Sequence, residues 1–455
     1  MDAAVESQIE SWRHYLTGRA AIAPGDVAEL EAHLRDQVDA LTDSGLAGEE
    51  AFLVAIRRLG ALDELSREYA HEHSDRLWKQ LVVSGDVPER RREVVLAVAV
   101  AVLAAVAIKV PALFGIGFGA GGDFYAPNLA VLVLPFLAGW FLVRRRASAG
   151  TIALVAASFA AAALVVNLYP FVPQGMTAFL TPVHIAVVLW LVVGIAYAGG
   201  DVVSARTRMD FIRFTGEWAV YLVLIGLGGG VLIAATTGVF SAVGLDASRV
   251  VEEWVLPCGL AGAVVVAGVL VEAKQSVIEN IAPVLTRVFT PLFAVLLLVF
   301  IGVGLAQGNL IQPSQGALRV FGQRDLLIVF DLVLVIVLGL LLYALSARDP
   351  FARPGWFEAL QLVLVVAALV VDLLVLIAMI GRIGSFGASP NKIASLGLNL
   401  ILLANLAGAA WLHWRFLRGR AAFGRLESWQ TAFVPVYLTW AAAVAVLVPP
   451  LFGFR

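Results

Sequence analysis

The sequence predicts an all-α protein: a small helical domain followed by an α-helical transmembrane bundle of about 11 spans. Three observations predict it. The 455 residues are 60% hydrophobic and 15% charged, whereas an average soluble domain is about 45–50% apolar and about 25% charged. Eleven apolar segments reach the roughly 20 residues that a helix needs to cross a bilayer. Charge is also divided along the chain, since residues 1–83 hold 16 acidic and 8 basic side chains and residues 84–455 hold 18 and 24. These features exclude a water-soluble enzyme, and a total net charge of −2 gives no argument for nucleic-acid binding.

The predicted domains follow this division of charge. Residues 1–83 form an acidic helical domain, residues 84–93 a basic juxtamembrane linker, and residues 94–455 the transmembrane bundle. Within the first domain, Leu30, Leu34, Val38 and Leu41 recur at three-to-four spacing, which is typical of the buried face of a helix. A second helix is expected from residue 49 to residue 59, and a third unit around residues 62–69.

The predicted spans have boundaries set by hydropathy alone. They cover residues 94–114, 126–143, 151–169, 178–198, 215–243, 252–272, 284–306, 325–346, 357–381, 393–414 and 430–451.

The orientation of the bundle is predicted from its basic residues. With the amino end inside, the loops on that side contain 17 Lys and Arg residues, and the opposite loops and tail contain 6. An excess of this size is what the positive-inside bias produces. No secretory signal pattern opens the chain. We therefore expect a multi-pass protein of the inner (cytoplasmic) membrane, with its amino terminus cytoplasmic and its carboxyl terminus external.

The first domain resembles a known bacterial module. The resemblance is carried by the strings Glu31-Ala-His-Leu-Arg-Asp36, Gly45-Leu-Ala-Gly-Glu-Glu50, Arg57-Arg-Leu-Gly60 and Leu65-Ser-Arg-Glu-Tyr69. They are similar to the permease-prefix or accessory-signalling (HAAS-type) module, which precedes membrane permease segments or lies beside PadR-like transcription regulators. The resemblance implies a regulatory or docking domain, and hence a cytoplasmic protein partner that binds residues 1–83.

The membrane bundle resembles a large bacterial integral-membrane family of unknown function. This resemblance rests on Phe214-Thr-Gly-Glu-Trp218, the Gly228-Gly-Gly230 run, the segment from Pro283 to Pro291, and the segment from Arg382 to Lys392. It covers roughly residues 200–455 and implies no activity. Phe386 and Ala388 stand where that family usually has Tyr and Leu.

The candidate site consists of ionisable and amide groups inside the predicted spans. A charge at mid-bilayer costs at least about 2.5 kcal/mol on insertion scales, so such residues often mark ion or substrate pathways. By contrast, Glu217 and Glu272 lie near predicted helix ends, where we expect them to contact interfacial water, and His184 and His413 are expected to be packed or interfacial. The intramembrane candidates are Asp331, Asp372, Asn399, Asn405 and Lys109, with Arg324 and Arg382 as candidate ion-pair partners.

Three interpretations of these residues remain open. They lock neighbouring helices together, or they line a path for a cation, a proton or a small solute, or they serve an enzyme that acts on a lipid. No phosphate-binding glycine loop, zinc motif or nucleophile elbow is present, and Cys258 is the single cysteine, so we expect no enzyme, cofactor or metal site. The favoured function is regulated transport, with a non-transporting membrane sensor as the alternative. The lipid bilayer is a certain partner of such a chain. The Gly304-x-x-x-Gly308 spacing permits close helix approach and therefore a homo-oligomer.

Overall fold

The structure is a computed structural model that describes residues 3–17, 24–59, 87–117, 122–242, 245–274, 281–306, 324–348, 352 and 354–455. Every regular element within these ranges is a helix, so the all-α prediction is confirmed. The chain divides into two compact units, Met1–Glu93 and Val94–Arg455.

The first unit packs three helices around one small core: α1 (Ala3–Thr17), α2 (Pro24–Asp43) and α3 (Gly48–Leu59). Ile9, Trp12 and Leu34 are fully buried there. The chain leaves α2 through Gly45, whose φ of 100° lies in the left-handed region that glycine adopts without strain. Arg35 bonds to Glu31 and Glu6, and these bonds raise the pKa of the Arg35 guanidinium above its ordinary value. The third helical unit predicted around residues 62–69 lies outside the described residues.

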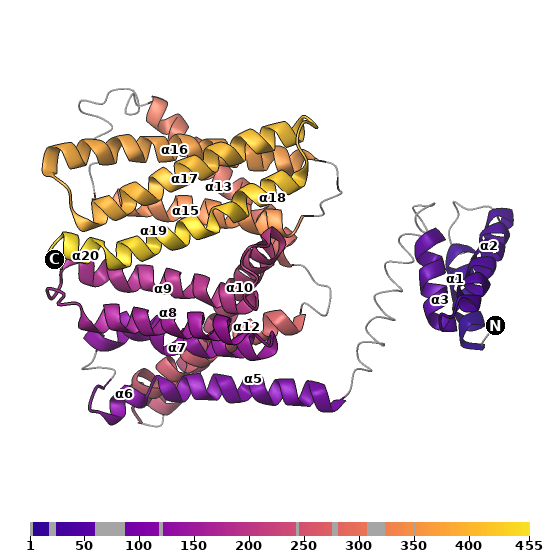
Figure 1. Ribbon diagram of the computed structural model, residues 1–455, viewed down its shortest axis with the longest axis horizontal. Helices are drawn as coiled ribbons and strands as arrows, with labels where there is room; N and C mark the ends of the chain where they lie inside the picture. The colour runs from indigo at the N-terminus through magenta and orange to yellow at the C-terminus, as the bar shows by residue number, and fades with distance from the viewer. Residues whose placement is uncertain are drawn as a thin grey trace. The chain divides into compact units, whose positions relative to one another are not determined.

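The apolar helices follow from α5 onward, and Figure 1 labels all of them except α11 and η1. They are α5 (Val87–Ala107), α6 (Val110–Leu113), α7 (Gly122–Arg144), α8 (Ala149–Leu168), α9 (Met176–Tyr197), α10 (Ala205–Ala242), α11 (Ser248–Val250), η1 (Val251–Val255), α12 (Leu256–Lys274), α13 (Ile281–Ala306), α15 (Arg324–Ser346), α16 (Trp356–Phe386), α17 (Pro390–Leu417), α18 (Phe423–Ala432), α19 (Val434–Val446) and α20 (Val448–Leu451).

Within the described residues, ten helical segments are long and apolar enough to cross a membrane. They correspond in order to the second through eleventh predicted spans, and the last of them joins α18 to α19 across a break at Phe433. The first predicted span is represented by the shorter apolar stretch Val95–Ala107 of α5. Many large apolar side chains face outward along these helices, as expected where lipid rather than water is the solvent.

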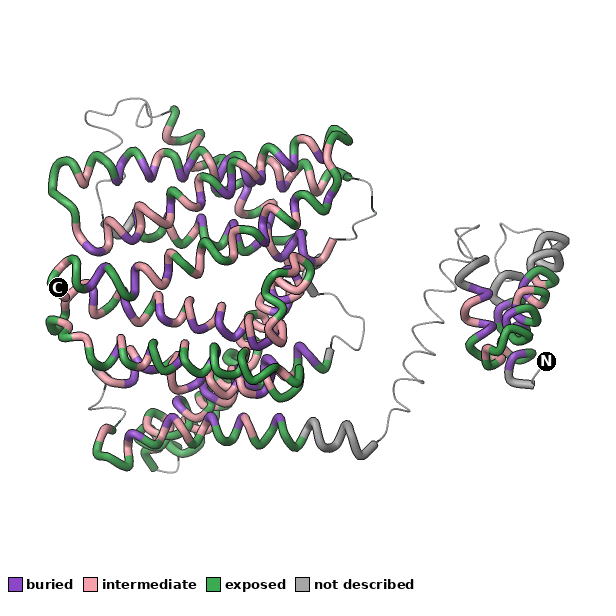
Figure 2. The backbone as a smooth tube through the Cα atoms, in the orientation of Figure 1, coloured by how far each residue is buried: buried purple, intermediate pink, exposed green. Residues whose placement is uncertain are grey.

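Two hydrophobic cores divide the membrane unit into two lobes. The N-terminal lobe is built from α7, α8, α9, α10 and α12, and its core contains Phe141, Leu189 and Phe214. The C-terminal lobe is built from α13, α15, α16, α17 and α18, and its core contains Leu334, Val371 and Leu406. Figure 2 shows buried residues recurring along α9, α16 and α17. Helix α10 packs on α15 and α18, and α19 packs on α9, so these helices connect the lobes.

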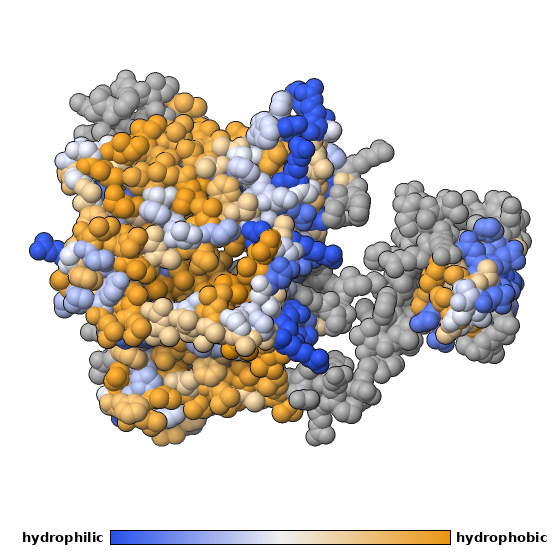
Figure 3. All heavy atoms as spheres, in the orientation of Figure 1, coloured by the Kyte–Doolittle hydropathy of each residue, from blue (hydrophilic) through white to orange (hydrophobic). Residues whose placement is uncertain are grey.

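One end of the membrane unit carries most of its described arginines, and we call it the basic edge. Figure 3 shows these hydrophilic side chains gathered beside an otherwise apolar wall. Several bind helix carbonyls there: Arg145 Nε donates to the Tyr197 carbonyl at 3.1 Å, and Arg208 Nη1 donates to the Thr431 carbonyl at 2.8 Å. Cations at helix carboxyl ends are favoured because carbonyls without partners concentrate there. The basic edge consists of Arg144, Arg145, Arg146, Arg206, Arg208, Arg213, Arg348, Arg415, Arg418, Arg420 and Arg425.

The structure corrects the expected surroundings of two glutamates. Glu217 and Glu272 are 5% and 6% exposed rather than in contact with bulk water. Glu272 Oε1 pairs with Arg144 and Arg145 at 3.2 and 2.8 Å. Sequence position alone placed it at a helix end, whereas packing of α12 against α7 covers that end.

Candidate functional site

Asp331 lies on α15 and is bonded to α17 by both of its carboxylate oxygens. Ser395 Oγ donates to Oδ2 at 2.7 Å, and Asn399 Nδ2 donates to Oδ1 at 2.8 Å. The two donors are four residues apart and therefore share one face of α17. Asn399 is fully buried, and its amide also donates to the Ser395 carbonyl, which holds it in place. Two of the intramembrane candidates, Asp331 and Asn399, are thus bonded to each other.

Asp372 lies on α16 and has a different environment. Its side chain is fully buried, and no group within the described residues hydrogen-bonds to either carboxylate oxygen. It lies close enough to Asp331 for the two charges to interact. An unsatisfied buried polar group costs about 1–3 kcal/mol, and more when it is charged. A buried carboxylate without a described partner, within electrostatic range of a second one, is therefore a potential site for a cation or a proton.

Asn405 and Tyr437 extend this polar region toward α19. Asn405 is fully buried, and neither of its side-chain polar atoms has a hydrogen bond to a described residue. Its amide lies near the Tyr437 hydroxyl without a hydrogen bond to it, and Asp372 lies near enough to influence that hydroxyl. Trp429 Nε1 holds this turn of α17 by donating to the Asn405 carbonyl at 3.1 Å. We call Asp331, Asp372, Asn399, Asn405 and Tyr437 the acidic site.

Neither Lys109 nor Arg382, two of the basic candidates, joins the acidic site in the described structure. Lys109 lies in the N-terminal lobe, where its Nζ donates to the Glu253 carbonyl and lies 4.3 Å from the centre of the Trp254 ring. Its position at the turn between α5 and α6 lets the ammonium reach a carbonyl of η1 in the N-terminal lobe. Arg382 lies ten residues beyond Asp372 on the same helix, about 15 Å along its axis. The side chain of Arg324 lies outside the described residues.

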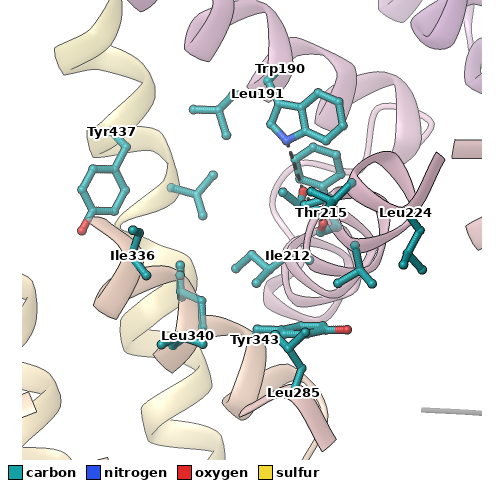
Figure 4. Close-up of a pocket in the computed structure, with 18 residues that line it drawn as sticks. Trp190, Leu191, Ile212, Thr215, Leu224, Leu285, Ile336, Leu340, Tyr343 and Tyr437 are labelled. Atoms are coloured by element: carbon teal, nitrogen blue, oxygen red, sulfur yellow. Dashed lines mark hydrogen bonds between the residues drawn. The ribbon is translucent and has the colours of Figure 1, made fainter. Parts of the chain in front are cut away.

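A cavity of about 680 Å³ lies between the two lobes, lined by residues of α9, α10, α13, α15 and α19. Its wall is almost entirely apolar (Figure 4), and the few polar groups include Thr215, which accepts a bond from Trp190 Nε1 at 3.2 Å. Gly216 leaves room for the Tyr343 ring, because a Cβ there would lie 2.5 Å from Tyr343 Cδ2. Neither aspartate lines this cavity, but Tyr437 does. The tyrosine therefore links the cavity to the acidic site.

A second polar cluster lies in the C-terminal lobe near the basic edge. Arg348 pairs with Glu358 at 2.8 Å, and its guanidinium lies 4.8 and 4.9 Å from the ring centres of Phe416 and Phe423, which also contact each other. His413 of α17 is 1% exposed and bonds through Nδ1 to the Ala409 carbonyl at 3.0 Å. Its Nε2 has no bond to any described group. Burial of His413 agrees with the sequence expectation, but its neighbours Glu358 and Arg348 were not foreseen.

Sequence reasoning also missed Ser395 and Tyr437. Ser395 could have been found from the sequence, since it precedes Asn399 by one helical turn and therefore shares its face of the helix. No such signal exists for Tyr437, which joins the site only because α19 packs against α17. No group of three or more His, Cys, Asp or Glu side chains that could hold a metal ion occurs in the described parts of the chain.

Comparison of the chain with protein families, curated proteins and solved structures gives no match. The fold and the site therefore define the class by themselves. The chain is a polytopic α-helical membrane protein with a small helical domain at its amino end. Its membrane unit has two lobes, with an apolar cavity between them and a buried acidic site in one of them.

Proposed function

We propose that this protein is a cation-coupled membrane transporter for a small solute. The observation that carries the proposal is Asp372, a fully buried carboxylate in a membrane span without a described hydrogen-bond partner and within electrostatic range of Asp331. A purely structural aspartate would be expected to resemble Asp331, whose oxygens are both bonded. The free-energy cost of burying Asp372 without a partner is better explained if its carboxylate binds a cation during part of a transport cycle.

The two-lobed architecture supports the same proposal. A chamber between two packed bundles can open to alternate sides when one bundle rocks against the other. The cavity of about 680 Å³ occupies this position, and it falls within the size range of small-molecule sites. Tyr437 contacts both regions and offers a route by which cation binding at Asp372 alters the cavity wall.

The proposal includes an orientation for the membrane unit and a role for the first unit. The basic edge faces the cytoplasm of a bacterial inner membrane in this scheme, by the positive-inside bias. The first unit then lies in the cytoplasm, where it acts as the regulatory or docking domain that its resemblance to the permease-prefix module implies. No large apolar side chain described on this unit, at residues 5–13 and 31–56, is exposed, so a partner that docks there would bind polar and charged side chains.

A solid-supported membrane tests the proposal without knowledge of the solute. Vesicles of the full-length protein are exposed to concentration jumps of H⁺, Na⁺ and K⁺, and the displaced charge is recorded. We expect at least one cation to produce a transient current that Asp372→Asn abolishes.

Asn128→Ala serves as the matched control. It breaks the amide pair that the buried Asn128 forms with the exposed Asn167 in the N-terminal lobe, at 3.0 and 2.8 Å, and should leave the current unchanged. Absence of a current with all three cations would reject cation coupling and favour the sensor. A wild-type current in Asp372→Asn would also reject the proposed role of this residue.

A further inference from the structure

A series of buried polar side chains runs through the C-terminal lobe from the basic edge to the acidic site. On α16, Glu358, Gln361 and Asp372 are separated by 3 and 11 residues, which places them within about 60° of one another on the helix. Gln361 and Asp372 are 4% and 0% exposed. One face of this helix is therefore polar near the basic edge and again at its middle.

Helix α17 adds one buried polar group near each end of the interval that α16 leaves apolar, with Leu406 and Ala409 fully buried between them. Between Gln361 and Asp372 the same face of α16 carries Val365 and Ala368, both fully buried in the core. His413 and Asn405 lie on the adjacent α17, eight residues or about 12 Å apart along its axis. The polar groups thus pass from α16 to α17 and back to Asp372.

The end near the basic edge has access to water. A cavity of about 370 Å³ is lined there by Arg287, Arg348, Trp356, Glu358 and Gln361. Glu358 accepts bonds from Arg348 and from the Gly355 N–H at 2.8 and 2.7 Å, which fix its carboxylate beside this cavity.

His413 is suited to receive a proton from this end. A carbonyl only accepts hydrogen bonds, so the bond to Ala409 places the hydrogen of neutral His413 on Nδ1 and leaves Nε2 with a free lone pair. No described group occupies that nitrogen. The charges that act on His413 are those of Glu358 on α16 and of Arg348 after α15. The charge of Asp331 acts on Asp372. The charge of Asp372 in turn acts on the Tyr437 hydroxyl.

We infer that this series of side chains is a proton path, and that the proton is the cation that binds at the acidic site. The inference rests on the proposed function, which leaves the identity of the cation open. A proton enters at Glu358, transfers to His413 Nε2 to give an imidazolium, and leaves that nitrogen through water beside Asn405. It then binds a carboxylate oxygen of Asp372, which becomes a neutral acid. Chains of Asp, Glu and His carry protons in this way through membrane proteins.

The composition of the path favours a proton over a metal cation. A bare cation needs several oxygen ligands arranged around one point, whereas the described groups here are spread along two helices and include an imidazole nitrogen. Five of their buried polar atoms have no bond to a described residue: both carboxylate oxygens of Asp372, both amide atoms of Asn405, and Nε2 of His413. Water molecules that satisfy these atoms would also connect them for proton transfer.

The test compares the kinetics of two histidine variants on the solid-supported membrane. We expect a pH jump, and not a Na⁺ or K⁺ jump, to displace charge in the wild type. His413→Leu should slow the decay of that current by about tenfold or more, which is a rise of about 1.4 kcal/mol in the barrier. His413→Gln keeps a polar side chain of similar length and should slow it as well, so the result does not depend on whether the leucine variant folds.

His184→Leu is the matched control. His184 also bonds through Nδ1 to the carbonyl four residues before it, at 2.8 Å, but it lies on α9 in the other lobe. We expect no change in this variant. A current that follows Na⁺ or K⁺ would overturn the proton inference and leave cation coupling intact. A proton current with wild-type kinetics in both His413 variants would overturn the path alone, and loss of current with every cation would overturn both proposals.

Discussion

The paired arginines of the basic edge allow a quantitative prediction about how the N-terminal lobe is held together. The change is Glu272→Gln, which keeps the shape of the side chain and removes its charge. Glu272 Oε1 accepts bonds from Arg144 Nε at 3.2 Å and Arg145 Nη2 at 2.8 Å, and its side chain is 4% exposed. These bonds tie the carboxyl end of α7 to that of α12.

The expected loss of unfolding free energy follows from how far Glu272 and its two arginine partners are buried. Breaking a fully buried ion pair costs about 3–5 kcal/mol, but the arginine side chains here are 30% and 35% exposed and are partly screened by water. We therefore expect Glu272→Gln to lower the free energy of unfolding by about 2 kcal/mol. The control is Glu253→Gln, whose partner Arg249 is 85% exposed. That pair should contribute at most about 0.5 kcal/mol.

The measurement is reversible unfolding of the full-length protein by sodium dodecyl sulfate in mixed micelles, followed by tryptophan fluorescence. Equal losses in the two variants would refute the argument, because exposure would then not determine the strength of these pairs. A loss below about 0.5 kcal/mol for Glu272→Gln would refute it as well.

Two further predictions concern packing. Gly397→Ala should destabilise the membrane unit by about 1–3 kcal/mol in the same unfolding assay, because its Cβ would lie 1.9 Å from Trp440 Cζ2. The control Gly384→Ala has open space around its Cβ and should be neutral or slightly stabilising. Equal effects of the two substitutions would contradict the close approach of α17 and α19. Leu34→Ala should lower the unfolding free energy of the first unit by about 2–5 kcal/mol, since Leu34 is fully buried. The variant should make that unit sensitive to limited proteolysis, while the Asp372-dependent current persists. Protease resistance equal to that of the wild type would contradict the three-helix core.

The prediction of the spans succeeded because it depends on chemistry that is local to each segment. A bilayer requires about 20 apolar residues in a helix whatever its neighbours are, so segments such as 178–198 and 393–414 could be located from hydropathy. The described helices Met176–Tyr197 and Pro390–Leu417 cover them. The first span was harder, since its described apolar helix Val95–Ala107 ends at a turn before Lys109.

The candidate site was predicted only in part, because partners on other helices depend on how the helices pack. Asp331, Asp372, Asn399 and Asn405 were found from their polarity, and they do gather in the C-terminal lobe. Lys109 met the same criterion and lies in the other lobe. Polarity within a span marks a residue as costly to bury, but it does not state which helix will face it.

Hydropathy and the positions of the charges were therefore sufficient to establish the class of the molecule, its membrane helices and the residues that are expensive to place in lipid. The packing of the helices decided the rest: the bonds of Asp331 to α17, the lack of a described partner for Asp372, and the position of Tyr437 in the cavity wall and near Asn405. The physical reason is that burial in lipid depends on each segment's own composition. Hydrogen bonding between helices depends instead on rotation and proximity, which arise only when all the segments pack together.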